Sequence, residues 1–407
     1  MESGETENLK FGKVDKSQKF QFQTKDLTRI SKIDTISPPS VFVGSKLRYP
    51  FVNVGILSPL NEDKEAWMYD DAKYWAQENF SINDVLNLRN SLLNSRFKSR
   101  VSDVRLNKKF VEISKEIAIA SKQVDVEIEL NKGINLNQDK DWVLTPHGMR
   151  AGLKDAKITS NVKIDSKVDK AINDEIRASE SLTYLYKNNI NEYSLAKILS
   201  IGVLGLKKNK KMVPTRWSIT ATDDSLSKEI MNSVKEFPIL NDYELFFGEF
   251  LGNQYLIMLF PDVWSFELFE LYYPGSSWNP SNDFRASTDF EDFNGRKEYA
   301  FNTAGGYYAT RFPILEYLKF IKRQASVLVI RLETPSYWAG LGVWVVRESV
   351  RKAIAKGELK FASREEFLDS VKKIAKIKYN FDANTILVKS KVLNTLKTQK
   401  KLTEFWK

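Results

Sequence analysis

Three aromatic-rich segments in the middle of the chain constrain the fold most. Residues 243–250, 253–260 and 264–273 each have the length and residue types of a β-strand, and Gly252 and the Pro261–Asp262 pair separate them. Turns this short favour antiparallel neighbours, so the simplest expectation is a meander. Helical patterns elsewhere do not alternate regularly with strands. This predicts an α+β fold of mixed or antiparallel sheets with flanking helices.

Helical and strand periodicities cover most of the remaining chain. They predict helices at residues 81–93, 107–121, 173–188, 192–200, 225–237, 313–324, 347–356 and 363–376. They predict further strands at residues 50–59, 124–130, 326–332 and 342–346. Residues 274–306 are rich in glycine, proline and polar side chains, so we expect a long loop there.

Both ends of the chain predict flexible tails. Residues 1–36 have few apolar anchors, and the prolines within residues 37–40 mark the expected start of the folded part. Residues 393–407 form the C-terminal tail. The first residues are acidic and no apolar run reaches 18 residues, so we expect a cytoplasmic protein that does not enter a membrane.

Cysteine and histidine content limits the chemistry of any site. The 407 residues include no cysteine and one histidine, His147, to which we assign no role. Disulfides, thiolate-bound zinc and iron–sulfur clusters are therefore excluded. No cofactor is indicated with certainty, and a metal here would be Mg²⁺ or Mn²⁺ held by carboxylates.

Residues 211–224, KMVPTRWSITATDD, concentrate an arginine, a tryptophan, hydroxyls and a carboxylate pair. Residues 216–222 alternate β-branched or aromatic residues with small polar ones, which predicts a strand. Asp223 or Asp224 would then cap the helix that follows. The pattern is equally typical of an ordinary core strand with its cap and of part of a site.

Carboxylates and arginines of this segment and of later ones are the candidates for catalysis. Clustered carboxylates could bind Mg²⁺ or Mn²⁺ for phosphodiester hydrolysis, and arginines could hold phosphate. No pair has diagnostic metal spacing, and the same carboxylates could be helix caps. The candidate catalytic residues are Arg216, Asp223, Asp224, Arg311 and Glu348, with Glu333 and Arg347 in the wider set.

The last residues of the chain have the spacing of a PIP box, the segment that docks repair and replication proteins on the sliding clamp PCNA. In a 3₁₀ turn, Leu402, Phe405 and Trp406 would share one side as an apolar plug, with Gln399 as a polar anchor. The alternative is a terminal helix packed on the core. The predicted PCNA-binding residues are Gln399, Lys400, Lys401, Leu402, Thr403, Glu404, Phe405 and Trp406.

Basic residues suggest nucleic acid as a second partner. The formal net charge is +10, and residues 351–407 alone carry 15 Lys and Arg against 6 Asp and Glu. A basic turn of Lys207, Lys208, Lys210 and Lys211 could contact a DNA backbone or could simply be solvated. Residues 272–278 and 305–311 hold aromatics beside glycines, which could stack bases or pack in the core.

Several stretches together resemble the archaeal Nre family of DNA-repair proteins. They are residues 37–44 (SPPSVFVG), 199–205 (LSIGVLG), 212–224, 305–311 (GGYYATR) and 341–348 (LGVWVVRE). The resemblance runs from about residue 37 to the end. It implies an N-terminal family region at 37–304, a C-terminal region at 305–392, and a tail at 393–407 that meets the clamp. Many relatives carry an N-terminal zinc-binding segment, but residues 1–36 have neither Cys nor His, so zinc is not carried over.

Two functions follow as hypotheses. The first is a DNA-damage-response protein recruited to PCNA through the C-terminal segment and acting on or near DNA. The alternative is a metal-dependent enzyme acting on DNA or a nucleotide-like phosphoester, with Asp223 and Asp224 in its site. Convergence of the candidate residues on one cleft would favour the enzyme.

Overall fold

The computed structural model describes residues 30–131, 134 and 143–398. The chain divides into two compact units. Of the described residues, the first unit comprises those within 30–226 together with 340–342, and the second comprises 227–339 and 343–398. Each unit has its own six-stranded sheet. The division falls inside the 20-residue helix α8 (Thr215–Val234).

The sheet of the first unit is mixed, with the order β1-β5-β6-β4-β3-β2. Its neighbours are antiparallel except for β4 and β6, which run parallel. The strands are β1 (Lys32–Ser37), β2 (Val41–Val43), β3 (Phe51–Pro59), β4 (Leu92–Arg100), β5 (Val124–Leu130) and β6 (Arg150–Ile158).

Short helices complete the first unit. They are η2 (Ala66–Asp70), α2 (Ala72–Gln77), α3 (Ile82–Asn90), η3 (Val101–Arg105), α4 (Lys109–Ile119), α5 (Ser166–Asn173), α6 (Ala178–Lys187), α7 (Glu192–Ile201) and η4 (Lys207–Asn209). Side chains cap the N-termini of several of these helices. Ser81 and Asp84 form a reciprocal capping box on α3, and Asn191 caps α7.

The sheet of the second unit has the order β10-β9-β11-β8-β7-β12. β11 pairs parallel with β9 and antiparallel with β8, so the last long strand of the chain lies between two earlier ones. The strands are β7 (Tyr243–Phe250), β8 (Asn253–Phe260), β9 (Ser265–Tyr272), β10 (Arg285–Glu291), β11 (Ser326–Glu333) and β12 (Leu359–Phe361).

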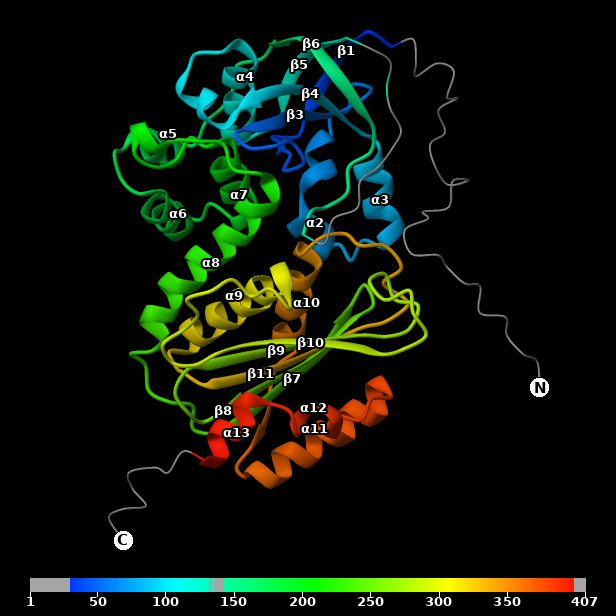
Figure 1. The fold of residues 1–407 in the computed structure, drawn as a ribbon, viewed down its shortest axis with the longest axis vertical. Helices are drawn as coiled ribbons and strands as arrows, with labels where there is room; N and C mark the ends of the chain where they lie inside the picture. The colour runs from blue at the N-terminus through cyan, green and yellow to red at the C-terminus, as the bar shows by residue number, and fades with distance from the viewer. Residues whose placement is uncertain (1–29, 132–133, 135–142, 399–407) are drawn as a thin grey trace, which may run out of the picture. The chain divides into compact units, whose positions relative to one another are not determined.

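Helices cover both faces of this second sheet (Figure 1). One face carries α9 (Ala304–Ile321) and α10 (Trp344–Ala355), and the other carries α11 (Arg364–Tyr379), α12 (Asn384–Leu387) and α13 (Lys391–Thr398). Because both faces are covered, every residue of β11 is buried. An apolar core packs between the sheet and α11–α13 around Phe367, whose ring meets Tyr243 and Phe260.

The α+β class is confirmed, and so are the strands at 124–130 and 326–332 and the helices at 192–200 and 363–376. The predicted meander is wrong in one place. β7 and β8 form the expected antiparallel hairpin, but β11 separates β8 from β9. Sequence periodicity identifies individual strands. It does not show that a strand from later in the sequence pairs between two earlier ones.

The strand predicted at residues 216–222 is wrong, because these residues lie inside α8. Pro214 precedes the helix, and its carbonyl accepts the Ser218 N–H at 3.0 Å. The hydroxyls that suggested a strand bond back along the helix, Ser218 Oγ to the Thr215 carbonyl (2.9 Å) and Thr220 Oγ1 to the Arg216 carbonyl (3.5 Å). Asp223 and Asp224 are therefore interior helix residues, and neither is an N-cap.

Other predicted boundaries move for local reasons. Residues 274–306 include β10 and the start of α9, which begins at Ala304 and contains Pro313. Gly306 suggested a loop, yet it lies in the helix. A glycine is required at this position because a Cβ would collide with the Glu270 carboxylate. Residues 344–346 begin α10 and are no strand, since a short buried apolar run does not distinguish helix from strand.

Two smaller corrections concern the first unit. In place of the single helix predicted at 173–188, the structure has the end of α5 at Asn173, an irregular connection over 174–177, and α6 from Ala178 to Lys187. The N-terminal extension predicted for residues 1–36 overlaps β1, whose residues from Lys32 pair with β5. Residues 1–29 of that extension lie outside the described part of the chain.

Candidate functional site

The segment around Pro214 ties together several elements of the first unit. The Met212 N–H donates to the Val101 carbonyl and the Val213 N–H to the Ser200 carbonyl, both at 2.8 Å. The Val43 N–H donates to Thr215 Oγ1, also at 2.8 Å. These bonds join the start of α8 to β2, η3 and α7, so the segment has a structural role beside any other.

The candidate residues Arg216, Asp223 and Asp224 all project from α8. Successive helical positions lie about 100° apart around the axis, so adjacent carboxylates point in different directions. Asp223 is buried, whereas Asp224 is half-buried. Within the described residues, no group of three or more His, Asp or Glu side chains could hold a metal ion.

Arg311 lies in the second unit, on α9, and belongs to a buried ion pair. Its Nη1 donates to Glu291 Oε2 of β10 at 2.6 Å, and both side chains are almost wholly buried. Its guanidinium also lies 5.4 Å from the ring centroids of Tyr307 and Tyr308. Trp264 Nε1 donates to the same Glu291 at 3.3 Å. Arg311 therefore fixes α9 to the sheet, and Tyr307 and Tyr308 are core residues.

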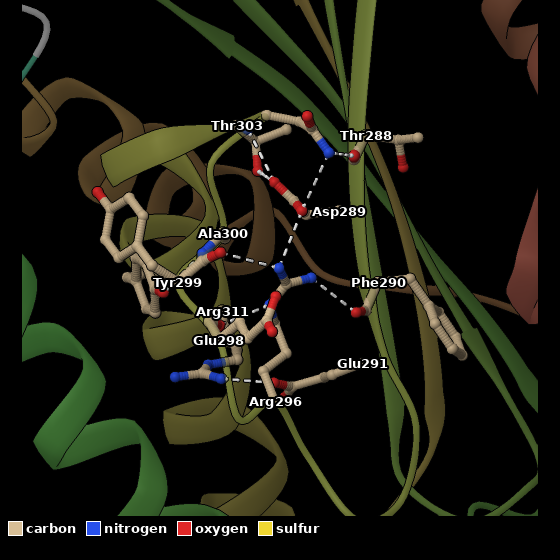
Figure 2. A network of polar contacts seen from close by, with 12 residues as sticks. Thr288, Asp289, Phe290, Glu291, Arg296, Glu298, Tyr299, Ala300, Thr303 and Arg311 are labelled. Atoms are coloured by element: carbon tan, nitrogen blue, oxygen red, sulfur yellow. Dashed lines mark hydrogen bonds and ion pairs between the residues drawn. The ribbon is translucent and has the colours of Figure 1, made fainter.

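A second arginine organises the loop between β10 and α9 (Figure 2). Arg296 pairs with Asp289 at 3.1 Å and donates to the Phe290 and Tyr299 carbonyls. Asp289 also accepts from the backbone N–H and the hydroxyl of Thr303, each at 2.9 Å. The loop is thus closed by paired charges.

Glu348, the remaining candidate, lies on α10. It pairs with Arg351 one turn later at 2.7 Å, and Arg351 pairs with Glu316 of α9 at 3.0 Å. Arg311 and Glu348 each take part in an ion pair within the second unit. The Arg351–Glu316 pair joins α9 to α10.

Polar residues also form a buried row across the second sheet. Arg331 of β11 lies between Tyr255 and Glu270 in register. It donates to Glu270 at 2.5 Å and to Glu333 at 3.2 Å. Burial raises the pKa of Glu333 to about 7, against the opposing charge of Arg331. Glu333 is thus a carboxyl that titrates near neutral pH.

The predicted basic turn coincides with η4 and the residues after it. Lys207, Lys208 and Lys211 are exposed. Lys210 differs, since its ammonium donates to the Ile172 carbonyl at 2.6 Å and partial burial lowers its pKa. Three of the four lysines therefore face solvent, and Lys210 is a structural residue.

An arginine distant in sequence joins this turn. Arg105 Nη1 donates to the Lys208 carbonyl at 2.7 Å and is itself exposed. We call Arg105, Lys207, Lys208 and Lys211 the basic cluster. Arg105 stands 103 positions before Lys208, so only the folded chain reveals it.

Comparison with known proteins assigns the chain. The family description "Archaeal Nre, N-terminal" matches residues 13–279, and "Archaeal Nre, C-terminal" matches residues 291–405.

The chain belongs to the archaeal Nre family.

Three curated relatives agree with this assignment. A "DNA repair protein NreA" of Haloferax volcanii is 37% identical, covering 90% of this chain and 88% of the relative. A "DNA repair protein NreA" of Archaeoglobus fulgidus is 40% identical, covering 86% and 87% respectively. A "DNA repair protein NreB" of the same organism is 36% identical, covering 83% and 84%. No solved structure matches.

The last described helix of this Nre family chain is anchored at its start. The buried Glu267 of β9 accepts from Ser390 Oγ (2.6 Å), the Lys391 N–H (3.0 Å) and the Val392 N–H (3.1 Å). A carboxylate at a helix N-terminus also meets the positive end of the helix dipole. The predicted clamp segment, residues 399–406, follows α13 directly and lies outside the described residues.

The described residues include no helix both long and apolar enough to cross a bilayer.

Proposed function

We propose that this Nre family protein is a DNA-repair factor that docks on the sliding clamp PCNA through residues Gln399–Trp406. The observation that carries the proposal is the spacing of Gln399, Leu402, Phe405 and Trp406 at the end of the sequence. The curated relatives named as DNA repair proteins support the repair role. The three apolar side chains would supply most of the binding free energy, as buried anchors do in small interfaces.

The position of α13 fits this role. Glu267 ties the start of the helix to the sheet, and the clamp segment begins one residue after Thr398. A short segment attached to an anchored helix has little chain between it and the folded unit. The clamp would therefore be held close to the second unit.

Calorimetry with the sliding clamp of the same organism tests the proposal. Removal of residues 399–407, and the double change Phe405→Ala with Trp406→Ala, should each abolish detectable binding. Ile377→Ala removes an exposed apolar side chain (79% exposed) from α11 and is the matched control. Unchanged affinity after the truncation would show that the clamp binds elsewhere or does not bind.

The basic cluster supports DNA as the second partner. Arg105, Lys207, Lys208 and Lys211 gather four cations, and Lys207 forms a long ion pair with Glu175 at 3.8 Å. Lysines and arginines grouped this way neutralise backbone phosphates without reading sequence. A clamp-bound factor would use such a surface to stay on the DNA that the clamp encircles.

The alternative function is a metal-dependent enzyme acting on DNA, with Asp223 and Asp224 in its site. It is the weaker proposal because the two carboxylates point about 100° apart on one helix. Arg311 and Glu348 add no support, since Arg311 pairs with Glu291 of β10 and Glu348 pairs with Arg351 within α10.

A further inference from the structure

The first unit contains a pocket that none of the predicted site residues lines. Its volume is about 290 Å³, near the lower end of the ~300–1,000 Å³ range of ligand sites. The walls come from η2, the end of α4, the start of α5 and the start of α7. Pro38 and Pro39 of the SPPSVFVG stretch also line it. This volume suits a ligand of a few rings at most.

One wall is an aromatic side chain held in place. The Trp67 ring packs edge-on against Tyr74 with centroids 4.8 Å apart, and its indole N–H donates to Glu65 at 2.6 Å. The Trp67 backbone N–H donates to Gln123 Oε1 at 3.3 Å, and Gln123 donates to the Lys64 carbonyl. Even so, 36% of Trp67 is exposed. A fixed ring with free surface is a platform for stacking.

Another wall is polar and equally ordered. Asn191 caps α7 through the Ser194 N–H at 2.9 Å, and both residues line the pocket with Tyr193. Amide and hydroxyl groups of this kind can both donate and accept hydrogen bonds. They suit the edge of a heterocycle better than an aliphatic ligand.

The lining also carries a set of opposing charges. Asp70 accepts from Arg89 at 2.5 Å and lies 3.5 Å from Lys197 Nζ. Burial would raise the pKa of Asp70, but Arg89 and Lys197 outweigh it and hold the pKa below its ordinary value. The charged lining residues are the three carboxylates Asp70, Asp71 and Asp165 and the two ammonium groups of Lys122 and Lys197.

This balance of charges bears on the ligand. Of the two cations in the lining, Lys197 is already paired with Asp70, so the pocket offers little free positive charge to a phosphate group. The carboxylates are also not grouped as a metal site within the described residues. A neutral, flat and polar ring fits the pocket best.

We propose that this pocket binds a single nucleobase, stacked on Trp67 with its edge toward Asn191 and Asp70 and its phosphates outside. The biological meaning of this proposal rests on the DNA role proposed above. Binding of a nucleobase to the pocket does not depend on that role. An unpaired base of DNA is the form in which the pocket would meet its ligand. Recognition of one exposed base needs only this small volume.

Titration of the full chain with adenosine, guanosine, cytidine and thymidine, followed by ligand-observed NMR, tests the proposal. At least one nucleoside should bind, and inorganic phosphate should not displace it. Trp67→Ala should weaken that binding on the order of 10-fold or more, as loss of base stacking does. Trp67→Phe keeps an aromatic face and should stay within about 3-fold.

Trp217→Ala is the matched control, because Trp217 is 58% exposed and lies outside the pocket. It should leave nucleoside affinity unchanged. No binding of any nucleoside at millimolar concentration, displacement by phosphate, or equal losses in both Trp→Ala variants would overturn the proposal. The Trp67→Ala protein should bind the clamp with wild-type affinity in calorimetry. Failure of the nucleobase proposal is therefore distinguishable from failure of the clamp-docking proposal.

Discussion

Arg311 Nη1 lies 2.6 Å from Glu291 Oε2, and the two side chains are 1% and 0% exposed. This ion pair accounts for an arginine that stood among the candidates for catalysis. The guanidinium is buried, pairs with a carboxylate and lies beside two tyrosine rings, so its role is structural. Its removal should therefore be felt as a decrease in stability.

Arg311→Ala should destabilise the protein by about 3–5 kcal/mol, because it leaves the Glu291 charge buried without its partner. Urea unfolding measures this. Replacing both partners, Arg311→Met with Glu291→Leu, should restore much of the stability. A stable Arg311→Ala protein that no longer binds DNA would argue for a direct functional role instead.

Glu333 should make stability depend on pH. Its pKa rises from 4.5 to about 7 on folding, so between these values the folded state binds the proton that the unfolded state has released. Stability should therefore fall by on the order of 3 kcal/mol as pH rises from about 4.5 to above 7. Unfolding of the wild-type protein and Glu333→Gln at pH 5 and pH 8 checks this. The same pH dependence in both proteins would exclude Glu333 as its source.

Neutralising lysines of the basic cluster should weaken DNA binding to a similar extent for all DNA sequences. For Lys207→Gln with Lys208→Gln, the slope of log affinity against log salt should become shallower by about one for each phosphate that the protein no longer neutralises. Fluorescence anisotropy from low to high salt measures it. Lys154→Gln with Lys157→Gln removes two exposed charges from β6 as a control. Equal effects of both pairs would point to net charge alone.

The enzyme alternative predicts hydrolysis of nicked, branched or crosslinked DNA with Mg²⁺ or Mn²⁺. It further predicts that Asp223→Asn with Asp224→Asn abolishes that activity. We expect the wild-type and doubly changed proteins to behave alike on these substrates, because the carboxylates do not share a direction. Cleavage by the wild-type protein that disappears in the variant would reverse the preference between the two functions.

The sequence predicted elements well where periodicity decides them. Strand 124–130 alternates strictly and is a half-buried strand, as such a pattern requires. The prediction failed at residues 216–222, where hydroxyls bonded to the preceding helical turn allow a β-rich composition in a helix. Propensity is a weak prior that such local bonds override.

Site residues were harder to predict because they depend on interactions between distant segments. Nothing near Lys208 in the sequence indicates that Arg105 joins it, or that Glu267 anchors the start of α13. The burial of β9 does indicate that Glu267 has a partner, since a carboxylate in a strand covered on both faces needs one. The pocket around Trp67 had no local signature, because its walls come from four separate elements.

The insertion of β11 between β8 and β9 has a consequence for synthesis and inheritance. The two family matches meet between residues 279 and 291, yet β8 and β9 lie before that junction and β11 after it. A ribosome releases β9 several seconds before β11, at roughly 5–20 residues per second. Until then β8 and β9 each have an open edge, which is the kind of edge that aggregates. A gene split at the junction would encode two fragments, neither of which contains all the strands of this sheet.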